Sequence, residues 1–164
     1  MDRREKVEFI LYQMRIMIKM EDQIRLLMVS KKINKKNIEH EGLEDLKIKF
    51  YSYLVFYHNH KNNYHEVSKC YKIIYDTYMS SDELQQSLDQ EIDFGFSLDK
   101  AKLLENLILY LVISPHSVER QQQLLAIQRD YALTLEKHPH LESLINKFLT
   151  LELISTKPSE YNVL

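Results

Sequence analysis

The chain has 164 residues, of which 45% are hydrophobic and 28% are charged, and its formal net charge is −2. This composition is typical of a folded globular domain and excludes a disordered chain. A charge so close to zero gives no general attraction to nucleic acid or to anionic membranes, so we expect neither partner. The single cysteine, Cys70, excludes an internal disulfide, and we expect a soluble, intracellular protein.

Residues that break helices are rare and lie between apolar runs. They are Gly42, Gly95, Pro115, Pro139 and Pro158. Because glycine and proline cost about 1 and 3 kcal/mol in a helix interior, the long stretches between them predict helices. No uncharged apolar run reaches the ~18–20 residues that span a bilayer. The fold class is therefore predicted to be all-α.

The first two helices are expected over residues 5–20 and 22–33. Apolar side chains cover more of the first helix than the ~100° stripe of a surface helix, so we expect neighbours on two sides, including a missing one on its N-terminal side. In the second helix, Ile24, Leu27 and Met28 predict the packed face. Four lysines follow, which complement the helix dipole and are a candidate for phosphate contact: Lys31, Lys32, Lys35 and Lys36.

The third and fourth helices are expected over residues 43–59 and 64–78, with Asn62 and Asn63 as the turn and the N-cap between them. Apolar and aromatic residues recur on one face of each helix. We predict that this stripe packs the helices together, in preference to binding a cofactor or a base. The packing residues that we select are Phe50, Tyr57, Tyr71 and Tyr75.

Residues 80–97 interrupt this pattern with five carboxylates and no lysine or arginine. We interpret the segment as a solvated acidic insertion that ends with Phe94, Gly95 and Phe96. The alternative hypotheses are a metal site or a docking strip for a basic partner. The carboxylates are Asp82, Glu83, Asp89, Glu91 and Asp93.

Three further helices are expected over residues 98–113, 118–137 and 141–154, separated by Pro115 and Pro139. The chain is therefore predicted to contain helix pairs over residues 5–35, 43–79 and 98–137, followed by a single helix over 141–154. Together they form a predicted helical-repeat domain of residues 1–156, and residues 157–164 are predicted to be a frayed tail. Repeats of about 34–47 residues with two helices per unit are typical of tetratricopeptide-like, HEAT and armadillo arrays.

No motif for catalysis is present: there is no phosphate-binding glycine loop, nucleophile elbow or zinc-protease signature. His58, Asn59 and His60 match the letters of a nuclease signature, but side chains two apart on a helix point about 200° away from each other. His138 and His140 flank a proline in a turn, and Glu41, Glu44 and Asp45 fit a helix start. We predict no catalytic, cofactor-binding or metal site and no small-molecule substrate.

Six collinear segments resemble the conserved block of a family of scaffold subunits of the 26S proteasome lid, which are PCI proteins. They run in order along the chain: KVEFILYQMR at 6–15, VSKKIN at 29–34, LKIKFY at 46–51, YHEV with YKIIYDT within 64–77, ILYLVISP at 108–115 and FLTLEL at 148–153. The acidic insertion has no counterpart of this length in the family. After Glu152 we expect a departure from the family pattern, without the winged helix that should follow, because residues 155–158 replace the family's arginine–tryptophan pair.

The resemblance implies a right-handed stack of antiparallel helix pairs and a non-catalytic scaffold role. It also implies other lid subunits as partners and a cytoplasmic and nuclear location. Three alternatives stay open: a scaffold of the COP9 signalosome, a free-standing solenoid adaptor for a peptide segment, and a metal-dependent nuclease at His58 and His60.

Overall fold

The computed structural model describes residues 2–40, 42–81 and 93–150. Predicted positions outside these ranges, among them Glu41, most of the acidic insertion and the tail, lie outside the described residues. The elements are α1 (Arg3–Lys19), α2 (Gln23–Ser30), α3 (Lys35–Ile38), α4 (Glu44–His60), α5 (Tyr64–Ser80), the 3₁₀ turn η1 (Asp93–Gly95), α7 (Lys100–Ile113), α8 (Val118–Asp130), α9 (Ala132–Leu135) and α10 (Pro139–Leu149). The predicted all-α fold class is confirmed.

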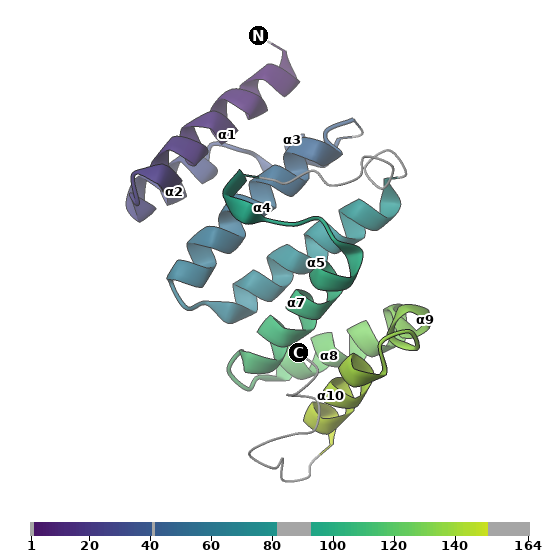
Figure 1. Ribbon diagram of the computed structural model, residues 1–164. Coiled ribbons are helices and arrows are strands. Elements are labelled where there is room, and N and C mark those ends of the chain that lie inside the picture. Colours follow the sequence, from purple (N-terminus) through teal and green to yellow (C-terminus); the bar gives the residue numbers. More distant parts are fainter. Residues whose placement is uncertain (1, 41, 82–92, 151–164) are drawn as a thin grey trace.

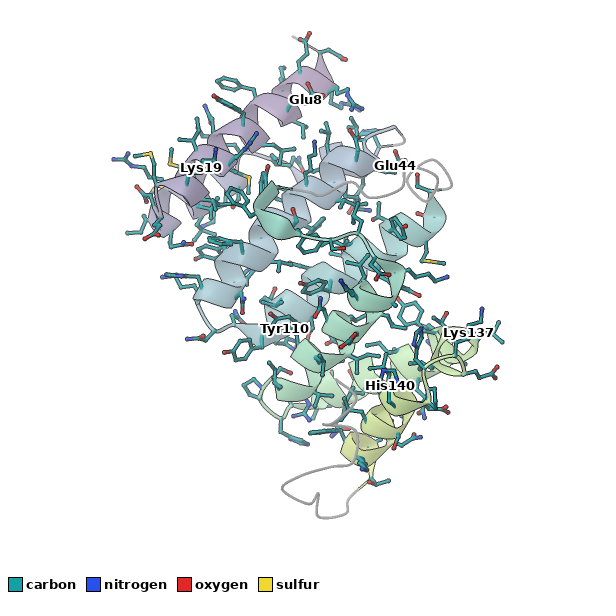
Figure 2. All side chains as sticks on the ribbon, viewed as in Figure 1. Glu8, Lys19, Glu44, Tyr110, Lys137 and His140 are labelled. Carbon is teal, nitrogen blue, oxygen red and sulfur yellow. The ribbon has the colours of Figure 1, made fainter. Side chains whose placement is uncertain are left out.

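The helices follow one another through the molecule from α1 to α10 (Figure 1). The α1–α2 pair packs on α4, α4 packs on α5, α5 packs on α7, and α7 contacts α8 and α10. Each helix is thus buried mainly by its neighbours in the stack, as in an α-solenoid. The core follows this order, and Figure 2 shows side chains such as Tyr110 of α7 in the middle of the stack.

Short polar side chains begin several of these helices by accepting hydrogen bonds from free backbone N–H groups. Asp2 and Glu5 form a capping box at the start of α1. Asp22 caps α2, Asp99 caps α7, and Ser117 caps α8 by accepting from the Arg120 N–H at 3.1 Å. These caps define helix starts that apolar periodicity alone places only approximately.

The predicted second helix ends too late and has the wrong buried face. α2 ends at Ser30, because Asn34 caps the separate short helix α3 by accepting from the Lys36 N–H at 3.1 Å. The buried residues of α2 are Leu26 and Ser30. Ile24 and Met28, which were predicted to pack, are 70% and 63% exposed.

The predicted helix over 118–137 is also interrupted. It divides at Tyr131, whose φ of −114° separates α8 from α9. The Tyr131 hydroxyl donates to the Asp76 carboxylate on α5, and its ring packs edge-on against Tyr75 at 5.1 Å. These contacts with α5 hold the backbone of Tyr131 in a non-helical conformation. The last helix begins at Pro139, two residues earlier than predicted, and ends at Leu149, not at 154, with Thr150 as an extended C-cap.

Candidate interaction surface

A group of large apolar side chains is exposed along α1 and α2. We call it the α1–α2 surface; its residues, with their exposed fractions, are Phe9 (54%), Tyr12 (60%), Met20 (61%), Ile24 (70%) and Met28 (63%). Large exposed apolar patches mark contact sites in soluble proteins, so these side chains are candidates for one.

The opposite face of α1 explains why this surface faces outward. Val7, Leu11, Met14 and Ile18 recur every three or four residues and are all buried. The same helix is apolar on its other side at Phe9 and Tyr12, where the described residues leave both rings exposed. The structure therefore covers one side of this helix, where α2 and α4 pack, and leaves the side with Phe9 and Tyr12 exposed.

Charged groups at the start of α1 connect it to the start of α4. The Arg4 guanidinium donates to the Asp45 carboxylate at 2.6 Å, to Glu8 at 3.0 Å and to the Gly42 carbonyl oxygen at 3.0 Å. The hydrogen bond to Asp45 raises the pKa of Arg4. These side chains are largely exposed, so the contacts orient the pair more than they stabilise it.

The predicted packing residues lie inside the stack. Phe50, Tyr71 and Tyr75 are 3%, 7% and 2% exposed, and Tyr57 is partly buried against the same core. The aromatic stripe of the fourth predicted helix is therefore confirmed as core. Tyr71 stacks on Tyr110 of α7 at 5.6 Å, and burial raises the pKa of its phenol above the usual value.

The histidines that matched a nuclease motif lie at the C-terminal end of α4. Burial lowers the pKa of His58, although Glu66 opposes the effect, and His60 is exposed. Within the described parts of the chain, no three His, Cys, Asp or Glu side chains are grouped closely enough to hold a metal ion. At the second histidine pair, the His138 and His140 rings meet edge-on at 5.9 Å, and His138 makes no side-chain cap to α10.

The lysine cluster divides between two elements instead of extending one helix. Lys31 and Lys32 lie in the turn after α2, whereas Lys35 and Lys36 begin α3. The side chains of Lys31, Lys32 and Lys36 are exposed. Phosphate contact by this cluster stays a prediction.

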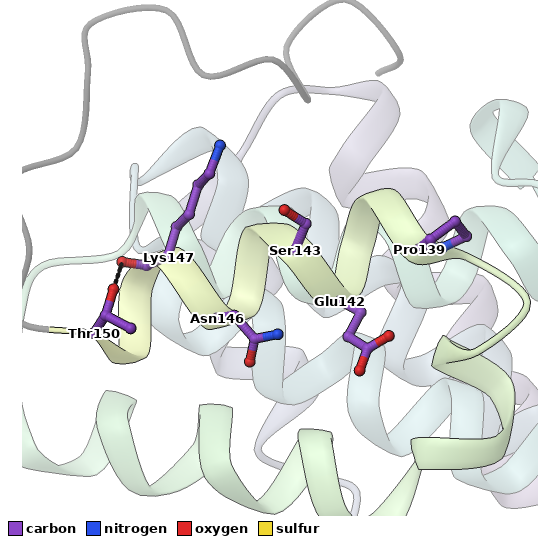
Figure 3. Close-up of a pocket in the computed structure, with 6 residues that line it drawn as sticks. All are labelled: Pro139, Glu142, Ser143, Asn146, Lys147 and Thr150. Atoms are coloured by element: carbon purple, nitrogen blue, oxygen red, sulfur yellow. Dashed lines mark hydrogen bonds between the residues drawn. The ribbon is translucent and has the colours of Figure 1, made fainter.

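Two hollows on the described surface are open to solvent. One, of about 350 Å³, is lined from Pro139 to Thr150 by α10 and its C-cap alone, and its side chains leave the helix in several directions (Figure 3). Another, of about 530 Å³, lies between the end of α5 and the α8–α9 junction and includes Tyr75, Asp76 and Tyr131. Convergent polar groups are typical of small-molecule sites, and a hollow lined by a single helix does not bring them together.

Among the described residues, no helix is both long enough and apolar enough to cross a bilayer.

Comparison with known proteins identifies the family. The family model described as PSMD12/CSN4, N-terminal, matches residues 1–83. The 26S proteasome non-ATPase regulatory subunit 12 of Dictyostelium discoideum is 31% identical over 154 residues, which cover 94% of this chain and 31% of that protein. The 26S proteasome regulatory subunit RPN5 of Saccharomyces cerevisiae is 32% identical over 155 residues, with the same coverage of 94% and 31%.

A third relative, the regulatory subunit rpn501 of Schizosaccharomyces pombe, is 29% identical over 93% of this chain. The chain thus spans about a third of the length of these relatives, 31% in each case. The chain belongs to the PSMD12/CSN4 N-terminal family.

Proposed function

We propose that the chain is a non-catalytic scaffold segment of the 26S proteasome regulatory-particle lid, and that it contributes to lid assembly and so to ubiquitin-dependent protein degradation. The relatives named as 26S proteasome regulatory subunits support the assembly, and the family resemblance implies a cytoplasmic and nuclear location. The observation that carries the scaffold role is the α1–α2 surface.

The end of a stack of helix pairs differs from its interior in the surface that it exposes to water. Each pair buries one face on its neighbour, and a terminal pair requires a polar outer face to stay in water. The α1–α2 surface is apolar instead, with five large side chains more than half exposed. We infer that in the assembly this surface is covered by a further helical element, on the N-terminal side of α1.

Dye binding tests whether the surface needs a cover. We expect the isolated chain to bind a hydrophobic dye, and the double variant Phe9→Ser with Tyr12→Ser to bind much less. A matched control is Leu125→Ser with Leu133→Ser, because these side chains are 55% and 79% exposed but lie on α8 and α9. A wild-type chain that is monomeric and binds no dye contradicts the idea of a missing neighbour.

Affinity capture tests the assembly itself. The tagged chain is captured from cell extract, and the proteins that copurify with it are identified by mass spectrometry. Other proteasome lid subunits are expected, with less recovery in the Phe9→Ser, Tyr12→Ser variant than in the control pair. Recovery of signalosome subunits instead would favour the COP9 alternative, and binding of short peptides without an assembly would favour an adaptor. Bound metal in the purified chain, by elemental analysis, would favour the nuclease.

A further inference from the structure

Residues 94–96 form an aromatic strap that leads from η1 towards α7 (Figure 1). Its two phenylalanine rings contact different helices. Phe94 lies against α4, with its ring centroid 6.0 Å from that of Tyr53 and 6.0 Å from that of Phe56. Phe96 stacks on Tyr71 of α5 at 5.6 Å, with the ring planes 19° apart. The strap therefore has one anchor on α4 and one on α5.

The two anchors are unequal. Phe96 is partly buried and packs against the hydrophobic core, where Tyr71 continues the stack to Tyr110. Phe94 is 45% exposed, and its partner Phe56 is itself 39% exposed. Although Phe94 also contacts the buried Tyr53, it leaves more of its own ring in water than Phe96 does, so the α4 anchor is the weaker one.

Backbone conformation weakens the α4 anchor further. Phe94 has φ 70° and ψ 29°, in the left-handed region that bulky side chains rarely adopt. Such a conformation persists only while its surroundings hold it, and what holds it here is the contact with Tyr53 and Phe56. Gly95 also has a positive φ, 71°, and no atom lies within 4 Å of the place where a Cβ would be. The strap therefore has two consecutive residues with positive φ, and no neighbour packs on the Cβ side of Gly95.

We propose that the strap is a latch in which Phe96 stays seated on Tyr71 while Phe94 leaves and returns to α4. Departure of Phe94 relieves its left-handed backbone and uncovers Tyr53, which is 3% exposed in the closed form. Departure of Phe96 would instead break its stacking contact with Tyr71, which lies in the core. The latch thus controls access to the aromatic surface formed by Tyr53 and Phe56 on α4.

The chain has no tryptophan, so a single substitution creates a unique fluorescent reporter. Phe94→Trp and Phe96→Trp are compared in the folded 164-residue chain by acrylamide quenching and by emission wavelength. We expect the quenching constant for Phe94→Trp to be at least about threefold larger than for Phe96→Trp, with emission at longer wavelength. Equal quenching of the two reporters overturns the proposal.

Two further variants keep the proposal testable if one reporter fails to fold. Phe94→Gly removes the ring and the backbone strain together, so we expect it to change the unfolding equilibrium constant by less than about fivefold. Phe96→Ala should lower the same constant by more than about thirtyfold. A large loss of stability in Phe94→Gly overturns the latch.

Nitration of Tyr53 by tetranitromethane, followed by peptide mass spectrometry, reports on the uncovered surface directly. We expect faster nitration of Tyr53 in Phe94→Gly than in the control Phe94→Tyr, which keeps a ring at this position. An unchanged rate shows that Phe94 does not cover Tyr53 and also overturns the proposal.

Discussion

Tyr71 lies between two aromatic rings, Phe96 on one side and Tyr110 on the other, each with its centroid 5.6 Å away. It is 7% exposed, so truncation would leave a cavity where α5 meets α7. We expect Tyr71→Ala to lower the free energy of unfolding by about 3–5 kcal/mol, by analogy with Phe→Ala in other cores. Urea unfolding measures this, with Tyr71→Phe as the control that keeps the ring. A loss below about 1 kcal/mol would contradict the core placement.

The same side chain makes stability depend on alkaline pH. Burial raises the pKa of the Tyr71 phenol, so the folded chain keeps this proton at pH values where the unfolded chain, with a tyrosine pKa of about 10, loses it. The resulting stabilisation is complete below about pH 10 and is lost as the pH rises from there through the folded-state pKa. We expect the unfolding free energy to fall above about pH 10, and less steeply in Tyr71→Phe. Identical slopes in both proteins would rule out this contribution.

At the scale of elements, the connection from α3 to α4 depends on one glycine. Gly42 has φ 85°, and no atom lies within 4 Å of the position that a Cβ would take. A side chain at this position would therefore strain the backbone but would not collide with a neighbouring atom. We expect Gly42→Ala to destabilise the chain by about 1–2 kcal/mol, and Gly42→Asn by less because asparagine tolerates the left-handed region. Thermal unfolding of the two variants measures the difference; equal stability of Gly42→Ala and wild type would contradict it.

Helix ends were the least predictable part of the elements. The first helix begins at Arg3, two residues before its predicted start, because Asp2 and Glu5 form a capping box there. The division of α8 from α9 at Tyr131 has no comparable local signal, since the residues that follow are compatible with a helix. It depends on the contacts of Tyr131 with Tyr75 and Asp76, which lie on α5. Such a break can be located only when the neighbouring helix is known.

At the scale of the whole molecule, Arg120 joins three helices near the C-terminal end of the stack. Its guanidinium donates to the Ser114 carbonyl oxygen at the end of α7 at 3.0 Å and lies 5.2 Å from the ring centre of Phe148 on α10. Arg120 is 6% exposed, and burial lowers its pKa. A charge in this position stabilises the fold through these partners and the packing of its stem.

We expect Arg120→Ala to cost about 2–3 kcal/mol, because it leaves the buried Ser114 carbonyl oxygen without this donor and removes packed methylenes. Arg120→Met, which keeps much of the stem, should cost less. Hydrogen exchange followed by mass spectrometry compares Arg120→Ala with the wild type. We expect the variant to exchange faster in α7, α8 and α10 but to change little in α1 and α2, since each helix is stabilised by its neighbours. Uniformly faster exchange along the chain would contradict a stack that is coupled only locally.

The sequence by itself determined that the chain is a series of helices, because glycine and proline lie only between its apolar runs. It also determined the family, through short segments in a conserved order, and the burial of the aromatic stripe at Tyr71 and Tyr75. The tertiary structure decided which face of a helix is covered when several faces are apolar. Periodicity cannot separate Leu26, which is buried, from Ile24, which is exposed, since both are apolar and only contact with another helix distinguishes them. For the same reason, the exposed α1–α2 surface and the strained position of Phe94 became visible only in three dimensions.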